Sequence, residues 1–91
     1  MKITVCVFGD ISDDIGKNYD FDILAKTTVY EILEKISISS GQRRGYLGNY
    51  KFDGKDLGFL VNGKNIEFLE GLETSLNDGD ELIIIQPTTG G

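Results

Sequence analysis

The chain has 91 residues, the length of a single domain with one thin core. Its formal charge of −6, from 15 acidic and nine basic side chains, argues against nucleic acid as a partner, because an acidic surface repels phosphate groups. With one cysteine, Cys6, and no histidine, the chain lacks the residues for an internal disulfide, a structural zinc site or a Ser-His or Cys-His catalytic pair. We therefore expect no catalytic residues, no bound metal and no enzymatic activity of its own.

The sequence carries no sign of a membrane partner. No apolar run approaches the length of a membrane helix. The N-terminal residues enter a strand-like pattern directly, without the apolar stretch and cleavage site of a signal peptide. These features predict a cytoplasmic protein.

The N-terminal part predicts two strands and a helix. β-Branched residues alternate with other side chains in residues 3–8, which predicts a strand that ends at Gly9. Residues 19–23 alternate between apolar and charged and predict a second strand, in a hairpin with the first. Thr28 and Glu31 have the spacing of a capping box, and apolar residues 29, 32, 33 and 36 then fall on one helix face. The helix should run from about residue 28 to residue 37.

Residues 39–58 differ in composition from the rest of the chain. They contain five of the 12 glycines, and four basic against two acidic side chains. We predict a variable, glycine-rich loop with one or two short elements. Its glycines lack the spacing of a phosphate-binding loop.

The C-terminal part predicts further strands. Residues 59–61 form a short strand, Asn62-Gly63 is a signal for a type I′ turn, and residues 65–68 can return as a short strand. After a turn at Asp78-Gly79, residues 81–85 are the most apolar segment, which predicts a central strand. Pro87 cannot donate a hydrogen bond to a sheet and therefore closes this strand.

This order of elements fits an α+β fold, a roll of the β-grasp type with a mixed sheet and one main helix on one face. Residues 1–85 form the domain, and residues 86–91 form a flexible C-terminal tail. Strand parity places one set of apolar side chains under the helix and another on the opposite face. The first set is Val5, Val7, Leu82 and Ile84, and the second is Cys6, Phe8, Ile83 and Ile85.

The second face is a candidate for docking a partner protein. An exposed apolar patch on a small domain commonly marks a protein interface. We select Phe8, Phe68 and Ile85 as the docking residues. The alternative is that residues 39–58 fold over this face.

The sequence ends in Gly90-Gly91, its most informative feature. Glycine has no Cβ, so a tail of this kind can thread a narrow channel that excludes larger residues. A carboxylate is a poor electrophile, and it would need activation by ATP as an acyl adenylate before it could take sulfide or an amine. The alternative is a tail that is merely flexible.

Residues 59–91 resemble the molybdopterin-synthase small subunits and related ubiquitin-like sulfur carriers. The resemblance rests on the turn Val61-Asn62-Gly63, the stretch Leu72–Asp80 and the ending Pro87–Gly91. It departs at Gln86, where the family commonly has the first of two prolines. The resemblance implies that a ubiquitin-activating-type enzyme adenylates Gly91 with ATP and Mg²⁺, so that this chain binds no cofactor itself.

The resemblance also implies that the surface near the tail, with Pro87, Thr88 and Thr89, contacts the activating enzyme and the acceptor. One function that follows is a sulfur carrier whose Gly91 thiocarboxylate goes to the large subunit of molybdopterin synthase. Another is a protein modifier joined through Gly91 to lysines of target proteins. A third hypothesis lies outside the resemblance: a β-grasp interaction domain without C-terminal chemistry.

Overall fold

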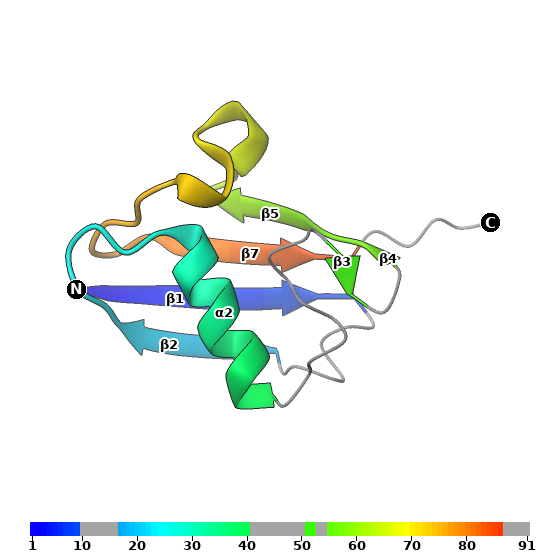
Figure 1. Ribbon diagram of the computed structural model, residues 1–91, viewed down its shortest axis with the longest axis horizontal. Helices are drawn as coiled ribbons and strands as arrows, with labels where there is room; N and C mark the ends of the chain where they lie inside the picture. Colours follow the sequence, from blue (N-terminus) through cyan, green and yellow to red (C-terminus); the bar gives the residue numbers. More distant parts are fainter. Residues whose placement is uncertain (10–16, 41–50, 53–54, 87–91) are drawn as a thin grey trace.

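The computed structural model describes residues 1–9, 17–40, 51–52 and 55–86 (Figure 1). The N-terminal elements, in chain order, are β1 (Lys2–Phe8), β2 (Asn18–Asp22) and α2 (Val29–Ser40). The elements that follow are β3 (Lys51–Phe52), β4 (Lys55–Asp56), β5 (Gly58–Val61), β6 (Lys64–Asn65), the 3₁₀ helices η2 (Ile66–Phe68) and η3 (Gly71–Glu73), and β7 (Glu81–Ile85). Within the described part of the chain, no helix has the length and hydropathy of a membrane span.

The main sheet has the strand order β2-β1-β7-β5-β6, and α2 crosses one of its faces (Figure 1). β1 pairs with β7 in parallel, whereas its pairing with β2 is antiparallel, as are the pairs β5–β7 and β5–β6. The sheet is therefore mixed, and the β-grasp roll predicted from the sequence is confirmed. β7 lies at its centre, as its apolar composition predicted.

The core lies between α2 and the sheet. The four apolar residues predicted for the inner face of the helix are all at 0% exposure: Val29, Ile32, Leu33 and Ile36. They face buried side chains from three strands, which include Val5, Phe59, Leu82 and Ile84. Full burial of one such side chain is worth about 1.5–3 kcal/mol, so packing rather than helix propensity stabilises α2.

The capping box that predicted the start of α2 is present. The Thr28 N–H donates to Glu31 Oε1, and the Glu31 N–H donates to Thr28 Oγ1, both at 3.4 Å. The helix ends at Ser40, three residues beyond the predicted end at 37. No glycine or proline interrupts the sequence before Gly41, so nothing in it stops the helix earlier.

The segment between the central strands differs in part from the prediction. Asn62 and Gly63 have φ angles of 51° and 86°, as the predicted type I′ turn requires. The returning strand predicted for residues 65–68 is wrong beyond Asn65, because the chain turns into η2 there. Asn65 Oδ1 accepts the Glu67 N–H at 2.9 Å, and Ile66 is fully buried, which draws the chain away from the sheet edge.

The predicted loop at 39–58 contains the short elements expected of it. β3 and β4 pair with each other in an antiparallel arrangement, and Gly58 already belongs to β5. The remaining glycines of this segment lie outside the described residues.

Asn62 connects the hairpin turn to the beginning of β7. Its N–H donates to the Glu81 carbonyl at 2.9 Å, and its side-chain Oδ1 accepts the Glu81 N–H at 3.0 Å. Its Nδ2 donates to Asp80 Oδ1 at 2.9 Å, while Asp80 Oδ2 accepts the Asn77 N–H at 2.8 Å. Two turns that are distant in the sequence therefore stabilise each other.

We predict that Asn62→Ala lowers the free energy of unfolding by about 2 kcal/mol, because alanine loses both side-chain hydrogen bonds and disfavours a positive φ. Urea denaturation measures the change. Asn62→Gly should recover only the part of the lost free energy of unfolding that comes from the positive φ. Asn77→Ala, which keeps its backbone hydrogen bond, is the control. A stability of Asn62→Ala equal to that of the control would contradict this role.

Candidate functional site

The face of the sheet opposite α2 carries an apolar strip, which we call the open-face strip: Cys6, Phe8, Leu60, Ile83 and Ile85. Cys6 lies opposite Ile83, and Phe8 lies opposite Ile85, in the parallel pairing of β1 with β7. Phe8 is 55% exposed and the other four are half-buried. The strand parity predicted from the sequence is confirmed. The alternative covering segment, residues 39–58, falls mostly outside the described residues.

Leu60 is not among the docking residues predicted from the sequence. It lies between the buried residues Phe59 and Val61 of β5, so strand parity points it to the open face, where it is opposite Ile83. The period-two pattern of residues 59–61 was the available signal for it.

Phe68 lies apart from the other predicted docking residues. Its side chain is 85% exposed, and it belongs to η2, which follows the edge strand β6. Ile85, by contrast, lies between Phe8 on β1 and Gly58 on β5. The structure therefore brings Phe8 and Ile85 together and leaves Phe68 on a different part of the surface.

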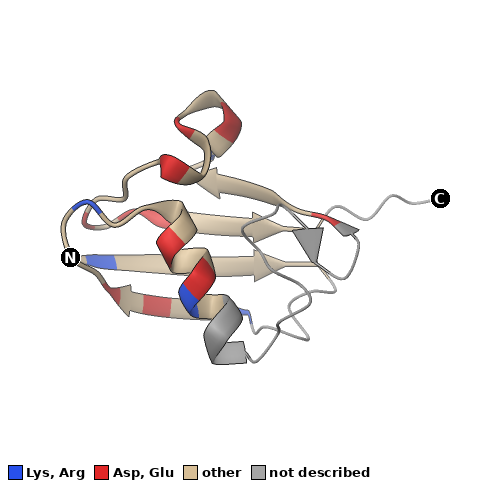
Figure 2. Cartoon of the chain, viewed as in Figure 1, with Lys and Arg blue, Asp and Glu red and all other residues tan. Residues whose placement is uncertain are grey.

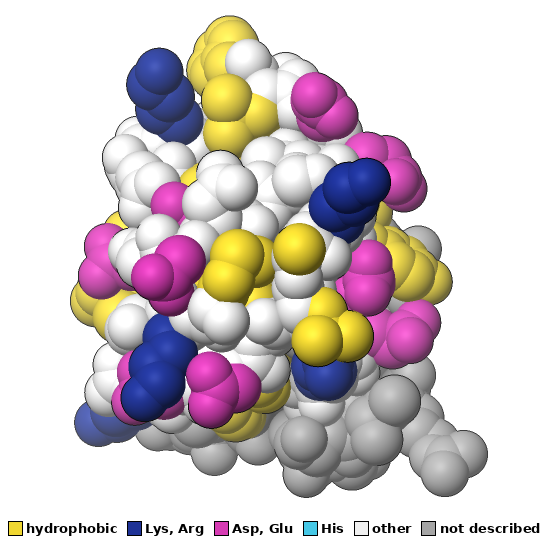
Figure 3. All heavy atoms as spheres, turned by 90° about the vertical axis from the view of Figure 1, so that its left-hand side faces the viewer, with side chains coloured by type: hydrophobic (Ala, Val, Ile, Leu, Met, Phe, Trp, Pro, Cys, Tyr) yellow, Lys and Arg dark blue, Asp and Glu magenta, His cyan; other side chains and the backbone are white. Residues whose placement is uncertain are grey.

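The open-face strip reaches the ends of β1 and β7, which carry no charged side chain of their own. Residues 6–9 and 82–86 contain no charged side chain, and the ends of β1 and β7 are tan in Figure 2. Charged side chains lie on β2, on α2 and toward the other end of the molecule, and Lys17, just before β2, lines a hollow together with Phe8 and Gly9. Figure 3, which views that other end, shows charged and apolar side chains mingled. The ends of β1 and β7 therefore offer apolar surface for a protein contact, with Lys17 at its border.

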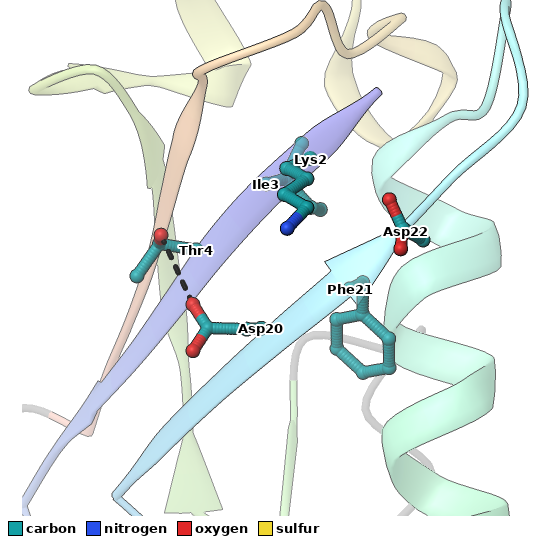
Figure 4. Close-up of a pocket in the computed structure, with 6 residues that line it drawn as sticks. All are labelled: Lys2, Ile3, Thr4, Asp20, Phe21 and Asp22. Atoms are coloured by element: carbon teal, nitrogen blue, oxygen red, sulfur yellow. Dashed lines mark hydrogen bonds between the residues drawn. The ribbon is translucent and has the colours of Figure 1, made fainter.

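The polar part of the open face does not have the composition of an active site. A hollow of about 340 Å³ between β1 and β2 is lined by Lys2, Ile3, Thr4, Asp20, Phe21 and Asp22 (Figure 4). Thr4 Oγ1 donates to Asp20 Oδ1 at 3.3 Å, which holds the hydroxyl on a carboxylate. The hollow combines exposed carboxylates with one amine, and among the described residues no third group hydrogen-bonds to Asp20 to orient it as the base of a catalytic triad. Among the described residues, no cluster of Cys, Asp and Glu side chains is arranged to hold a metal ion.

The Cys6 side chain in the open-face strip is held in its protonated form. Partial burial raises the pKa of Cys6 above its ordinary value, and the negative charges of Glu81 and Asp20 raise it further. Cys6 Sγ lies 3.9 Å from Glu81 Oε2 and donates to it. Because the protonated form dominates at neutral pH, Cys6 acts as a small apolar side chain and not as a nucleophile.

The chain leaves the sheet beside this strip. Gln86, assigned from the sequence to the tail, is only 7% exposed, and its N–H donates to the Phe8 carbonyl at 3.0 Å. The predicted site residues Pro87, Thr88, Thr89, Gly90 and Gly91 lie outside the described residues. The tail therefore begins within one residue of the Phe8–Ile85 pair.

The model of the ThiS family matches residues 6–91. The chain belongs to the ThiS family. The "Putative sulfur carrier protein" of Archaeoglobus fulgidus is 35% identical over 69 residues, which are 72% of this chain and 76% of that protein. ThiS-family membership agrees with the resemblance drawn from residues 59–91.

Solved structures share the fold over nearly the whole chain. Small archaeal modifier protein 1 from Methanosarcina acetivorans is 27% identical, with a TM-score of 0.72 and coverage of 99% of this chain and 96% of that one. A chain of the BexX/CysO complex from Amycolatopsis orientalis is 26% identical, with a TM-score of 0.66 and coverage of 98% and 99%. This ThiS-family chain is therefore a small ubiquitin-like protein of the carrier and modifier group and not an enzyme.

We predict that Glu81→Gln lowers the pKa of Cys6, because it removes the nearest negative charge and weakens the bond to the thiol. More thiolate is then present at any pH above neutral, so iodoacetamide alkylates the variant faster. The rate of alkylation against pH measures the shift. Glu34→Gln, on the exposed side of α2, is the matched control, and identical profiles for Glu81→Gln and wild type would refute the assignment.

Proposed function

We propose that this chain is a sulfur carrier whose C-terminal Gly91 is activated by a partner enzyme and converted to a thiocarboxylate. The observation that carries the proposal is the position of the open-face strip beside Gln86, where the tail begins. A partner that docks on the strip thereby receives the tail at a defined place. The 35% identity to a protein named as a sulfur carrier supports the same conclusion.

The chemistry takes place on the partner, which holds ATP and Mg²⁺. A carboxylate oxygen of Gly91 attacks the α-phosphorus of ATP, and pyrophosphate leaves, which gives an acyl adenylate. Hydrosulfide then attacks the acyl carbon, and AMP leaves with the electron pair of the broken C–O bond. The products are the Gly91 thiocarboxylate, AMP and a proton. A tail that ends in two glycines supplies the unhindered backbone that such an enclosed site requires.

The open-face strip is the surface that we propose docks the activating enzyme. A side chain such as Phe8 contributes most to the binding free energy when a pocket of the partner removes it from water. Because residues 6–9 and 82–86 carry no charged side chain, these strand ends add no unpaired charge to the contact. The acceptor of the sulfur, a synthase of the molybdopterin type, would dock on the same strip after the activating enzyme has left.

A second candidate function is that of a protein modifier. The match to a small archaeal modifier protein at 27% identity favours it. Activation of Gly91 is then the same, but the acyl group passes to a lysine amine of a target protein and forms an isopeptide bond. The two functions differ in the acceptor and share the docking surface.

We predict that incubation with a ubiquitin-activating-type adenylating enzyme, MgATP and sulfide replaces one oxygen of the chain by sulfur. Intact-mass spectrometry would detect the gain. A variant lacking Gly91 is the control and should stay unmodified, because the reacting carboxylate is displaced by one residue. The enzyme is checked in parallel on another carrier that it modifies. If the mass of the wild type then does not increase, the result contradicts the proposal and favours an interaction domain without C-terminal chemistry.

A further inference from the structure

Gly9 occupies a position that no other residue can fill without a shift. Its φ is +103°, in the region that side chains with a Cβ disfavour. A Cβ built on it would lie 2.8 Å from the Gln86 carbonyl oxygen and 2.9 Å from the Gln86 Cβ. Both distances are shorter than ordinary van der Waals contact. Glycine therefore lets the chain leaving β1 touch the chain leaving β7.

The contact fixes Gln86 from one side. The Gln86 N–H donates to the carbonyl of Phe8, the neighbour of Gly9, at 3.0 Å, and Gln86 is nearly completely buried. On the other side of β7, a Cβ built on Gly58 would lie 4.0 Å from the Ile85 carbonyl oxygen, an ordinary contact. The close approach is thus confined to the β1 side, at the first residue after the strand.

We propose that Gly9 and Gln86 are positioning residues that set the direction in which the tail leaves the domain. The inference rests on the proposed function, because the direction matters only if Gly91 is delivered to an active site. Gly91 lies five residues beyond Gln86, a reach of at most about 17 Å. With the open-face strip docked, the starting direction of so short a tail decides where the carboxylate arrives. A misplacement of about 1 Å can cost on the order of 100-fold in rate.

Gly9→Ala tests the inference, and Gly79→Ala is its matched control. Gly79 has a φ of +85°, so alanine is strained there too, but nothing lies within 4 Å of a Cβ built on it. Gly79 is also in the turn before β7, at the opposite end of that strand from Gln86. The control thus reproduces the backbone strain without the contact at the tail.

The measurement is steady-state kinetics of carrier activation by the adenylating enzyme, followed as pyrophosphate release. We expect Gly9→Ala to lower kcat by about tenfold or more, because Gly91 is misplaced in the docked complex. Its KM should stay within about twofold of wild type, because the open-face strip is unchanged. Gly79→Ala should keep the wild-type kcat. Amide hydrogen exchange should also accelerate at Gln86 in Gly9→Ala and not in Gly79→Ala.

Equal kcat values for Gly9→Ala and Gly79→Ala, with wild type active, would overturn the inference and leave the proposed function standing. An inactive wild type would instead overturn the proposed function. Should Gly9→Ala fail to fold by circular dichroism, Gln86→Gly is the second variant, since it leaves β1 intact and removes the packed side chain. It should lower kcat with an unchanged KM, and a wild-type kcat would refute the positioning role.

Discussion

The parallel pairing of β1 with β7 is the constraint on which the rest of the structure depends. Parallel neighbours need a long crossover connection, and here everything from β2 to η3 forms it. Both strands run in the same direction, so their C-terminal ends lie at the same end of the sheet, where Phe8 lies opposite Ile85. The beginning of the tail and the apolar strip meet there for that reason alone.

The two faces of this pair have different roles. Side chains of one parity, such as Val5 and Leu82, are fully buried under α2 and stabilise the fold. Side chains of the other parity, such as Cys6 and Ile83, stay half-buried on the open face. Within the described part of the chain, α2 is the α-helix that packs on the sheet and it covers one face, so the half-buried apolar side chains of the other face can serve a partner. The proposed docking surface thus follows from the same alternation that builds the core.

Much of this could be predicted from the sequence, because it depends on local patterns. Strand parity, the capping box at Thr28 and the Asn62-Gly63 turn each involve residues close together in the chain, and each is confirmed. The family could also be predicted, from the motifs near the C-terminus.

The features that escaped prediction depend on contacts between distant segments. The sequence pattern predicts that Ile66 belongs to a strand, and only the structure shows that the core buries it. The hydrogen bonds of Asn62 with Asp80 and Glu81 join turns that are 18 and 19 residues apart. Gly9 reads only as the end of a strand, because its contact with Gln86 exists only once β7 has paired with β1. The separation of Phe68 from Phe8 likewise follows from η2, which the pattern of residues 65–68 did not indicate.

The most direct test of the account compares Phe8→Ala with Phe68→Ala in activation by the adenylating enzyme. Both remove an exposed phenyl ring, but only Phe8 lies beside the start of the tail. The account predicts that Phe8→Ala raises KM by about tenfold and that Phe68→Ala leaves KM near the wild-type value. A rise in KM for Phe68→Ala with none for Phe8→Ala would contradict it, because the partner would then dock away from the paired ends of β1 and β7.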